Sequence, residues 1–284
     1  MEANKQTLPA SGKNAGANTA LANSKKLQFS TLIKSDAVQK SLEGTLGDSM
    51  RTKTFTSSLI SAVSTNPALR DCDGMTIISA ALLGESLNLS PSPQLGQYYM
   101  VPFRDNKSGT VKATFQLGWK GYYQLALRSG QYQNIDAVAV KEGELKSYNP
   151  ITGDIDLDPI QDPIEREKAK TIGYYAYFTL NNGFTKKLYW SREKMQAHAE
   201  KYSKGYAAHK GYTFWEKDFD SMALKTMYRQ LIGKYGIMSI EMQQAYVNDM
   251  SIQPDTTKDD AEPVFFDAVS TDVTNSDTGE VSGE

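Results

Sequence analysis

Residues 97–130 read QYYMVPFRDNKSGTVKATFQLGWKGYYQLALRSG, and this stretch decides the fold class. Two segments rich in aromatic and β-branched residues, 97–104 and 111–117, flank a polar turn at 105–109. That order predicts two antiparallel strands joined as a hairpin. Residues 121–129 then have the composition of a short helix, and Gly130 stands where a left-handed glycine commonly ends one. A hairpin that runs into a helix indicates a mixed α and β domain.

The chain before this hairpin is expected to be helical. Apolar residues recur at helical spacing over residues 27–65, and Gly44 and Gly47 are expected to divide that range into two helices. Asp73 is placed to cap a third helix over residues 74–89, because its side chain can accept from the free backbone N–H groups of the first turn.

The chain after the hairpin alternates between strands and helices. It predicts a strand at 134–141, an acidic connection at 150–170, and a second hairpin whose turn is Asn181-Asn182-Gly183. Further helices are expected at 191–202, 214–234 and 239–248. The fold class is therefore α+β, with antiparallel hairpins flanked by N-terminal and C-terminal helices. We expect one domain over residues 27–247, with residues 1–26 disordered because they are poor in large apolar residues, and with residues 248–284 as an acidic, disordered tail.

Composition excludes several classes of protein. With one cysteine, Cys72, the chain cannot form an internal disulfide, which favours a reducing, cytoplasmic location. The longest apolar run, near residues 77–83, is too short to span a membrane, and residues 1–26 lack the apolar core of a signal peptide. Motifs for nucleotide phosphates, for zinc peptidases and for serine hydrolases are absent from the sequence. We therefore expect no catalytic residue, metal or cofactor.

The acidic residues 154, 156 and 158 form the one carboxylate run with metal-like spacing. Proline stands at 159, where the turn of a calcium-binding loop requires glycine. We interpret the run as a solvated acidic loop. A metal-dependent nuclease that uses these carboxylates stays open as an alternative.

Charge is distributed unevenly along the chain. The net charge is −2, yet residues 248–284 hold ten acidic residues and one basic residue, so the preceding residues carry +7. A basic body with an acidic tail favours a polyanionic ligand for the body and a partner or self-masking role for the tail. A tail that only improves solubility is the alternative.

Two basic stretches are candidates for that ligand. Residues 97–130 carry a net charge of +4 with aromatic residues interleaved, a pattern that suits single-stranded nucleic acid, because cations hold phosphates and aromatic rings stack on bases. The alternative is that most of these rings belong to the core. Residues 186–234 carry +6, and Ser221, Lys225 and Arg229 share one face of the long predicted helix. An ordinary solvated helix face is the alternative there.

Several separated blocks resemble the RecT-type recombinases, the RecT and Red beta group. The blocks are FQLGWKGY at 115–122, VKEGE at 140–144, LNLSP at 87–91, and residues from Trp215 to Lys225 followed by Ser239-Ile240-Glu241. They agree in order and spacing over roughly residues 27–247. A non-enzymatic scaffold or structural protein of a phage particle stays the alternative, although it does not explain the basic hairpin.

The resemblance implies a phage or prophage protein that binds single-stranded DNA and anneals complementary strands without ATP. It implies a ring or helical filament that holds DNA, including the annealed duplex intermediate, in a basic groove. A 5′→3′ exonuclease and a host single-strand-binding protein are the implied partners, with the C-terminal tail as the docking segment. The implied location is the cytoplasm of a bacterial host, away from membranes.

On this hypothesis, basic residues hold backbone phosphates, Gln116 and Ser221 add neutral hydrogen bonds, and Trp119 or Tyr123 stacks on bases. The residues expected to bind DNA are Arg104, Lys107, Lys112, Gln116, Trp119, Lys120, Tyr123, Arg128, Lys141, Lys204, Lys210, Ser221, Lys225 and Arg229.

Overall fold

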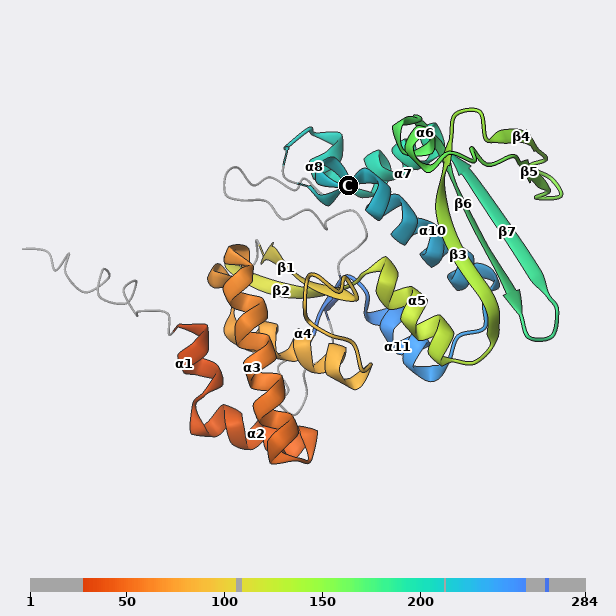
Figure 1. Ribbon diagram of the computed structural model, residues 1–284. Coiled ribbons are helices and arrows are strands. Elements are labelled where there is room, and N and C mark those ends of the chain that lie inside the picture. Colours follow the sequence, from red (N-terminus) through yellow and green to blue (C-terminus); the bar gives the residue numbers. More distant parts are fainter. Residues whose placement is uncertain (1–27, 106–108, 212, 254–263, 266–284) are drawn as a thin grey trace, which may run out of the picture.

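The computed structural model describes residues 28–105, 109–211, 213–253 and 264–265 (Figure 1). It has the expected α+β class, with every strand pair inside a sheet antiparallel. The expected disorder of residues 1–26 and of the distal tail concerns residues outside these ranges. Helices α1–α4 lie beside a hairpin on one side of the molecule, and a second sheet with its own helices lies on the other (Figure 1).

Residues 28–65 form three α-helices, one more than the two expected before the helix that Asp73 caps. Gly44 lies inside α2 and does not end it, whereas Gly47 ends α2 in the left-handed conformation, with φ of 72°. Asp73 caps α4 as expected, because its carboxylate accepts from Met75 N at 3.0 Å. The helices are α1 (Phe29–Ile33), α2 (Asp36–Leu46), α3 (Ser49–Thr65) and α4 (Gly74–Ser86), with a 3-10 turn at Pro67–Asp71.

The first hairpin is confirmed as β1 (Tyr98–Asp105) and β2 (Thr110–Leu117), in register from Tyr98 opposite Leu117. Two short segments extend its sheet beyond β2: β8 (Ser251–Ile252) pairs with β2, and β9 (Val264–Phe265) pairs with β8. Residues 249–253, assigned to the tail from sequence, thus belong to the folded body, and the side chains of Asp249, Ser251 and Gln253 are buried. The expected boundary at residue 248 is too early because backbone pairing with β2 holds this segment.

The second sheet follows α5 (Trp119–Arg128) and has the order β3-β6-β7. Its strands are β3 (Tyr132–Lys141), β6 (Thr171–Leu180) and β7 (Thr185–Ser191), which confirms the second hairpin. The acidic connection is more ordered than expected, since β4 (Leu145–Tyr148) pairs with β5 (Ile155–Leu157) and α6 (Pro163–Lys168) follows. Buried Glu144, from the VKEGE block, accepts from Arg166 Nε at 2.6 Å. This contact holds α6 near the end of β3.

The long helix expected at 214–234 is two helices, α9 (Phe214–Lys217) and α10 (Phe219–Tyr235). Asp218 separates them because its carboxylate accepts from Ser221 N at 3.0 Å and caps α10. As a result Phe214 belongs to α9 and not to the first turn of α10, and its side chain is half exposed. The other helices are α7 (Arg192–Tyr202), capped by Ser191 as expected, α8 (Lys204–Ala207) and α11 (Ile240–Asn248).

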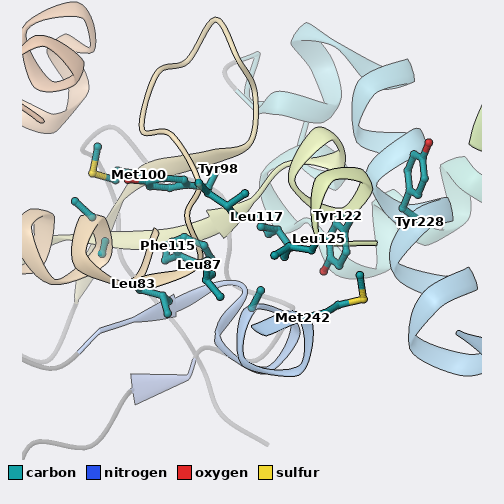
Figure 2. Close-up of a cluster of buried hydrophobic side chains, with 14 of the residues drawn as sticks. Leu83, Leu87, Tyr98, Met100, Phe115, Leu117, Tyr122, Leu125, Tyr228 and Met242 are labelled. Carbon is teal, nitrogen blue, oxygen red and sulfur yellow. The ribbon is translucent and has the colours of Figure 1, made fainter. Parts of the chain in front are cut away.

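The core joins the first hairpin to its neighbouring helices. Tyr98 and Phe115 stack with ring centroids 5.1 Å apart, and both are buried. Figure 2 shows this pair near Leu83 and Leu87, with Tyr122 and Leu125 of α5 and Met242 of α11 beyond Leu117. Each large apolar side chain buried here contributes roughly 1.5–3 kcal/mol. Because α10 contacts both α5 and strands β3 and β6, it links the two sides of the molecule.

Candidate nucleic-acid interface

Two adjoining cavities lie between the end of β2, the start of α5, and helices α9 and α10. One, here named the inner cavity, has a volume of about 240 Å³ and extends to His198, Arg229 and Met250. The other, the aromatic cavity, has about 270 Å³ and extends to Tyr99 and Trp119. Both are lined by the same four residues, Gln116, Phe214, Met222 and Lys225. We name the two cavities together the groove.

Glycines bring the hairpin close enough to α5 to form this groove. Gly118 N donates to Gln97 O at 2.8 Å and begins the turn into α5. A Cβ atom on Gly118 would lie 2.1 Å from Gly96 O, and one on Gly121 would lie 2.1 Å from Gln97 O. Only glycine permits such an approach of two backbones. The glycines of the FQLGWKGY block therefore place Gln116 and Trp119 at the groove.

A buried carboxylate organises the charges of the groove. Asp249 accepts from Leu117 N at 2.8 Å, from Tyr122 OH at 3.0 Å, from Lys225 Nζ at 3.4 Å and from Arg229 Nη1 at 2.5 Å. Its side chain is fully buried. Two cations thus face one carboxylate when Lys225 is in its ammonium form, and the cluster then carries one positive charge in excess. A buried excess charge attracts a counter-ion of opposite sign, so the groove favours an anion.

Lys225 is the cation of this cluster that lines both cavities. Burial lowers the pKa of its ammonium group, and the neighbouring Asp249 partly opposes that shift. The Lys225–Asp249 contact is longer than the Arg229–Asp249 contact, so the carboxylate holds the arginine more closely. An anionic ligand in the groove would supply the stabilisation that Lys225 lacks.

Gln116 also lines both cavities, and its side chain is nearly buried, with 7% of the residue exposed. Among the described residues, the buried side-chain atoms without a hydrogen-bond partner are Ser79 Oγ and Tyr98 OH, so the Gln116 carboxamide, which bonds no other described group, keeps access to solvent in the groove. The amide therefore presents a donor and an acceptor to whatever occupies the groove.

Aromatic rings border the aromatic cavity. Tyr99 and Phe214 lie with ring centroids 6.2 Å apart and are 36% and 47% exposed. Trp119 stacks on Tyr228 at 6.1 Å and 8°, and Lys120 Nζ lies 5.6 Å from the centre of the Trp119 ring. Tyr123 instead contacts the edge of Tyr228 and packs against the core. The border of the cavity thus exposes planar apolar surface beside a cation.

Sequence reasoning missed Tyr99, Phe214 and Lys217 as residues of this groove. The alternation of β1 was the available signal for Tyr99, because Tyr98 faces the core and the next side chain must face outward. Nothing in the local sequence places Phe214 here, because the apolar pattern predicts one continuous helix over residues 214–234.

The structure brings together five of the residues expected to bind DNA: Gln116, Trp119, Ser221, Lys225 and Arg229. The alternative of an ordinary solvated helix face does not hold for this part of α10, because Asp249 draws Lys225 and Arg229 inward and leaves Lys225 buried. Ser221 Oγ donates to Asp218 at 2.6 Å. Lys120 is exposed next to Trp119, at the edge of the groove.

The other expected residues lie elsewhere. Arg104 and Lys112 are at the far end of the hairpin, where Arg104 pairs with Val111 and Lys112 with Phe103. Arg128, at the end of α5, donates to Asn88 O at 3.3 Å, and Lys141 Nζ donates to Thr171 Oγ1 at 3.1 Å. Lys204 and Lys210 are exposed at α8 and just after it. Lys107 lies outside the described residues.

His198 belongs to the wall of the inner cavity and contacts three aromatic rings, those of Trp190, Tyr202 and Trp215. Burial, followed by the charge of Lys201, lowers the pKa of its imidazole to about 4. The ring is therefore uncharged at neutral pH and adds nothing to the positive charge of the groove.

The alternative of a metal-dependent nuclease gains no support from the described residues. Over residues 28–105, 109–211, 213–253 and 264–265, His, Cys, Asp and Glu side chains form no group of three that could hold a metal ion. Asp154, from the acidic run, accepts instead from Thr152 Oγ1 at 2.7 Å. In the same ranges no helix is both long and apolar enough to cross a membrane.

Comparison with known proteins agrees with the blocks identified in the sequence. The model of the RecT family matches residues 53–264. The uncharacterized protein YqaK of Bacillus subtilis (strain 168) is 39% identical over 218 residues, which cover 77% of this chain and 70% of YqaK. Protein RecT of Escherichia coli (strain K12) is 33% identical over 218 residues, which cover 76% of this chain and 73% of RecT. The matched range includes the hairpin, α5, α10 and Asp249.

Proposed function

The chain belongs to the RecT family of DNA-binding recombination proteins, and from this premise we propose that it binds single-stranded DNA in the groove and anneals complementary strands. The observation that carries the proposal is the cluster of Lys225, Arg229 and Asp249, whose excess positive charge lies beside the unpartnered amide of Gln116. A phosphodiester supplies a second anion for the two cations, and the nucleotide that carries it supplies hydrogen-bonding groups for the amide.

Annealing requires that the protein hold the backbone and leave most base edges free. The groove meets this requirement when phosphates lie at Lys225, with Lys120 and Lys217 as further cations near its mouth. Backbone contacts of this kind carry no sequence information. Each phosphate neutralised on a single strand lowers the slope of log affinity against log salt by about 0.7. Binding is therefore sensitive to salt and tolerant of sequence.

Assembly compensates for the small number of contacts in one groove. Subunits that line up along a strand convert weak single contacts into one multivalent contact through high effective concentration. We propose a ring or helical filament that binds the strand and then the annealed duplex intermediate. The exposed apolar residues Ile240 and Val247 of α11, and Leu127 of α5, are candidate subunit contacts.

The remaining parts of the proposal rest on membership of the family. Strand annealing of this kind needs neither ATP nor a covalent step, so we propose a non-enzymatic protein without a cofactor. It would act in the cytoplasm of a bacterial cell during recombination of phage or prophage DNA. A 5′→3′ exonuclease would supply the single strand, and the acidic C-terminal tail would contact that nuclease or the host single-strand-binding protein.

The test is an annealing assay with two complementary fluorescent oligonucleotides and no ATP, at two salt concentrations. We expect the protein to accelerate pairing of complementary strands, more strongly at low salt, and to leave non-complementary strands unpaired. Binding without acceleration would reduce the proposal to a single-strand-binding protein. Absence of binding at low salt, also after removal of residues 266–284, would overturn it in favour of a phage scaffold protein.

A further inference from the structure

We infer that the aromatic cavity takes up one nucleobase per subunit from the bound strand, and that the Gln116 carboxamide hydrogen-bonds the edge of that base. This inference rests on the proposed single-strand binding and adds a ligand group to it. It divides the groove into two parts: the cations of the inner cavity hold the backbone, and the aromatic cavity holds a base.

The walls of the aromatic cavity fit a planar aromatic group. Tyr99 and Phe214 border it from β1 and α9, and Trp119 borders it from the start of α5. Most of the lining surface is apolar, and its volume of about 270 Å³ is below the range of roughly 300–1,000 Å³ that is typical of pockets for drug-sized ligands. A group the size of one base is therefore the appropriate occupant. Exposed rings on a DNA-binding surface stack on bases irrespective of sequence.

The exposure of two of these rings supports a ligand. Phe214 is 47% exposed because the cap formed by Asp218 turns α9 away from α10. Tyr99 is 36% exposed because it follows Tyr98, which takes the inward position on β1. The two rings are tilted by 38° relative to each other, with centroids 6.2 Å apart. Stacking of a base against them would bury apolar surface that the folded monomer leaves in water.

The polar residues of the cavity fit the edge of a base. Gln116 offers both a donor and an acceptor, and every base has both on its edge. The amide therefore satisfies any of the four bases and gives little sequence preference. Lys225 lies at the boundary with the inner cavity, where it can meet the phosphate attached to the same nucleotide.

The experiment compares two strands of equal length and charge, an oligothymidylate and an oligonucleotide made of abasic residues. Phe214→Ala removes a wall of the cavity. Phe184→Ala is the matched control, because Phe184 is 48% exposed in the turn between β6 and β7 and does not line the groove. Gln116→Met removes the amide at nearly constant length. Affinity and its salt dependence are measured by fluorescence anisotropy, and thermal unfolding checks that each variant is folded.

We expect the wild-type protein to bind the oligothymidylate more tightly than the abasic strand, by roughly 5- to 150-fold, the range given by loss of one stacked base. Phe214→Ala and Gln116→Met should reduce this difference and leave the salt slope unchanged, whereas Phe184→Ala should keep it. Equal wild-type affinity for both strands, with a normal salt slope, would overturn the base cavity and leave backbone binding intact. Failure to bind either strand at low salt would overturn the proposed function as well.

Discussion

Arg229 Nη1 lies 2.5 Å from Asp249 Oδ2, although the arginine belongs to α10 and the aspartate to the segment after α11. The same carboxylate accepts from the backbone of Leu117, at the end of β2. One side chain therefore connects the first hairpin, α10 and the C-terminal segment at the groove. The stability of the domain and the position of its cations depend on the same contact.

Asp249→Ala should lower the free energy of unfolding by about 3–5 kcal/mol, because it leaves Lys225 and Arg229 buried without a counter-charge. Urea unfolding followed by circular dichroism measures the change. The control is Asp158→Ala, which breaks the exposed ion pair with Lys146 and should cost less than about 1 kcal/mol. Equal losses in both variants would contradict an organising role for Asp249.

Lys225→Met should weaken single-strand binding and reduce the salt slope by about 0.7, the value for one phosphate contact. The wild-type affinity should also fall as pH rises through the lowered pKa of Lys225, below the usual range of lysine, because only the ammonium form attracts phosphate. Lys225→Met should not show this decrease. Anisotropy titrations between neutral and alkaline pH test both effects, with the exposed Lys146→Met as the control. A wild-type pH profile in Lys225→Met would place the phosphate elsewhere.

Two glycine substitutions should have opposite effects on stability. Gly121→Ala places a methyl group 2.1 Å from Gln97 O, so the hairpin and α5 must separate, at a cost of about 1–3 kcal/mol. Gly44→Ala lies within α2 with no atom within 4 Å of the new Cβ, and should stabilise the domain by about 0.5 kcal/mol. Thermal unfolding of the two variants distinguishes them. We also expect Gly121→Ala, and not Gly44→Ala, to lose affinity for single-stranded DNA; a stable, fully binding Gly121→Ala would refute the close approach.

Acid should destabilise the folded chain partly through His198. Its pKa of about 4 lies below the value near 6.5 of an unfolded chain, so the unfolded state binds the proton more tightly. The contribution of the uncharged His198 ring to the free energy of unfolding is therefore complete above about pH 6.5, and it is lost as pH falls towards 4. After allowance for partial exposure, the loss is on the order of 1–2 kcal/mol. His198→Phe should flatten the stability profile over this range, and urea midpoints at several pH values measure it. An unchanged profile would show that other groups carry the acid sensitivity.

The local sequence was sufficient for the elements that local chemistry fixes. Asp73 and Ser191 begin their helices by accepting from the first-turn N–H groups, and both were identified from residue type and position. The two hairpins followed from β-branched and aromatic runs around polar turns. Asp218 was missed as a helix boundary, because an aspartate inside a periodic apolar pattern does not reveal whether its carboxylate turns back to the backbone.

The groove could be predicted only in part, because its decisive contacts are long-range. Lys225 and Arg229 have helical spacing that fits a solvated face equally well, and the carboxylate that draws them inward is 24 and 20 residues away. Asp249 was counted with the acidic tail, since its charge matches the residues that follow. Charge counts identify a basic body, but they do not show which cations are paired inside it.

The contact between Leu117 and Asp249 spans 132 positions, which has a consequence for the order of events during synthesis. The ribosome releases the N-terminal helices, both hairpins and α10 before residue 249 emerges, and domains generally begin to fold from the N-terminal side. Until then Lys225 and Arg229 face each other without a counter-charge, and β2 lacks its neighbour β8. A nascent chain that stops before residue 249 thus contains most of the fold but not its closing contact. The emergence of residue 249 from the ribosome is therefore the step at which the groove acquires its final form.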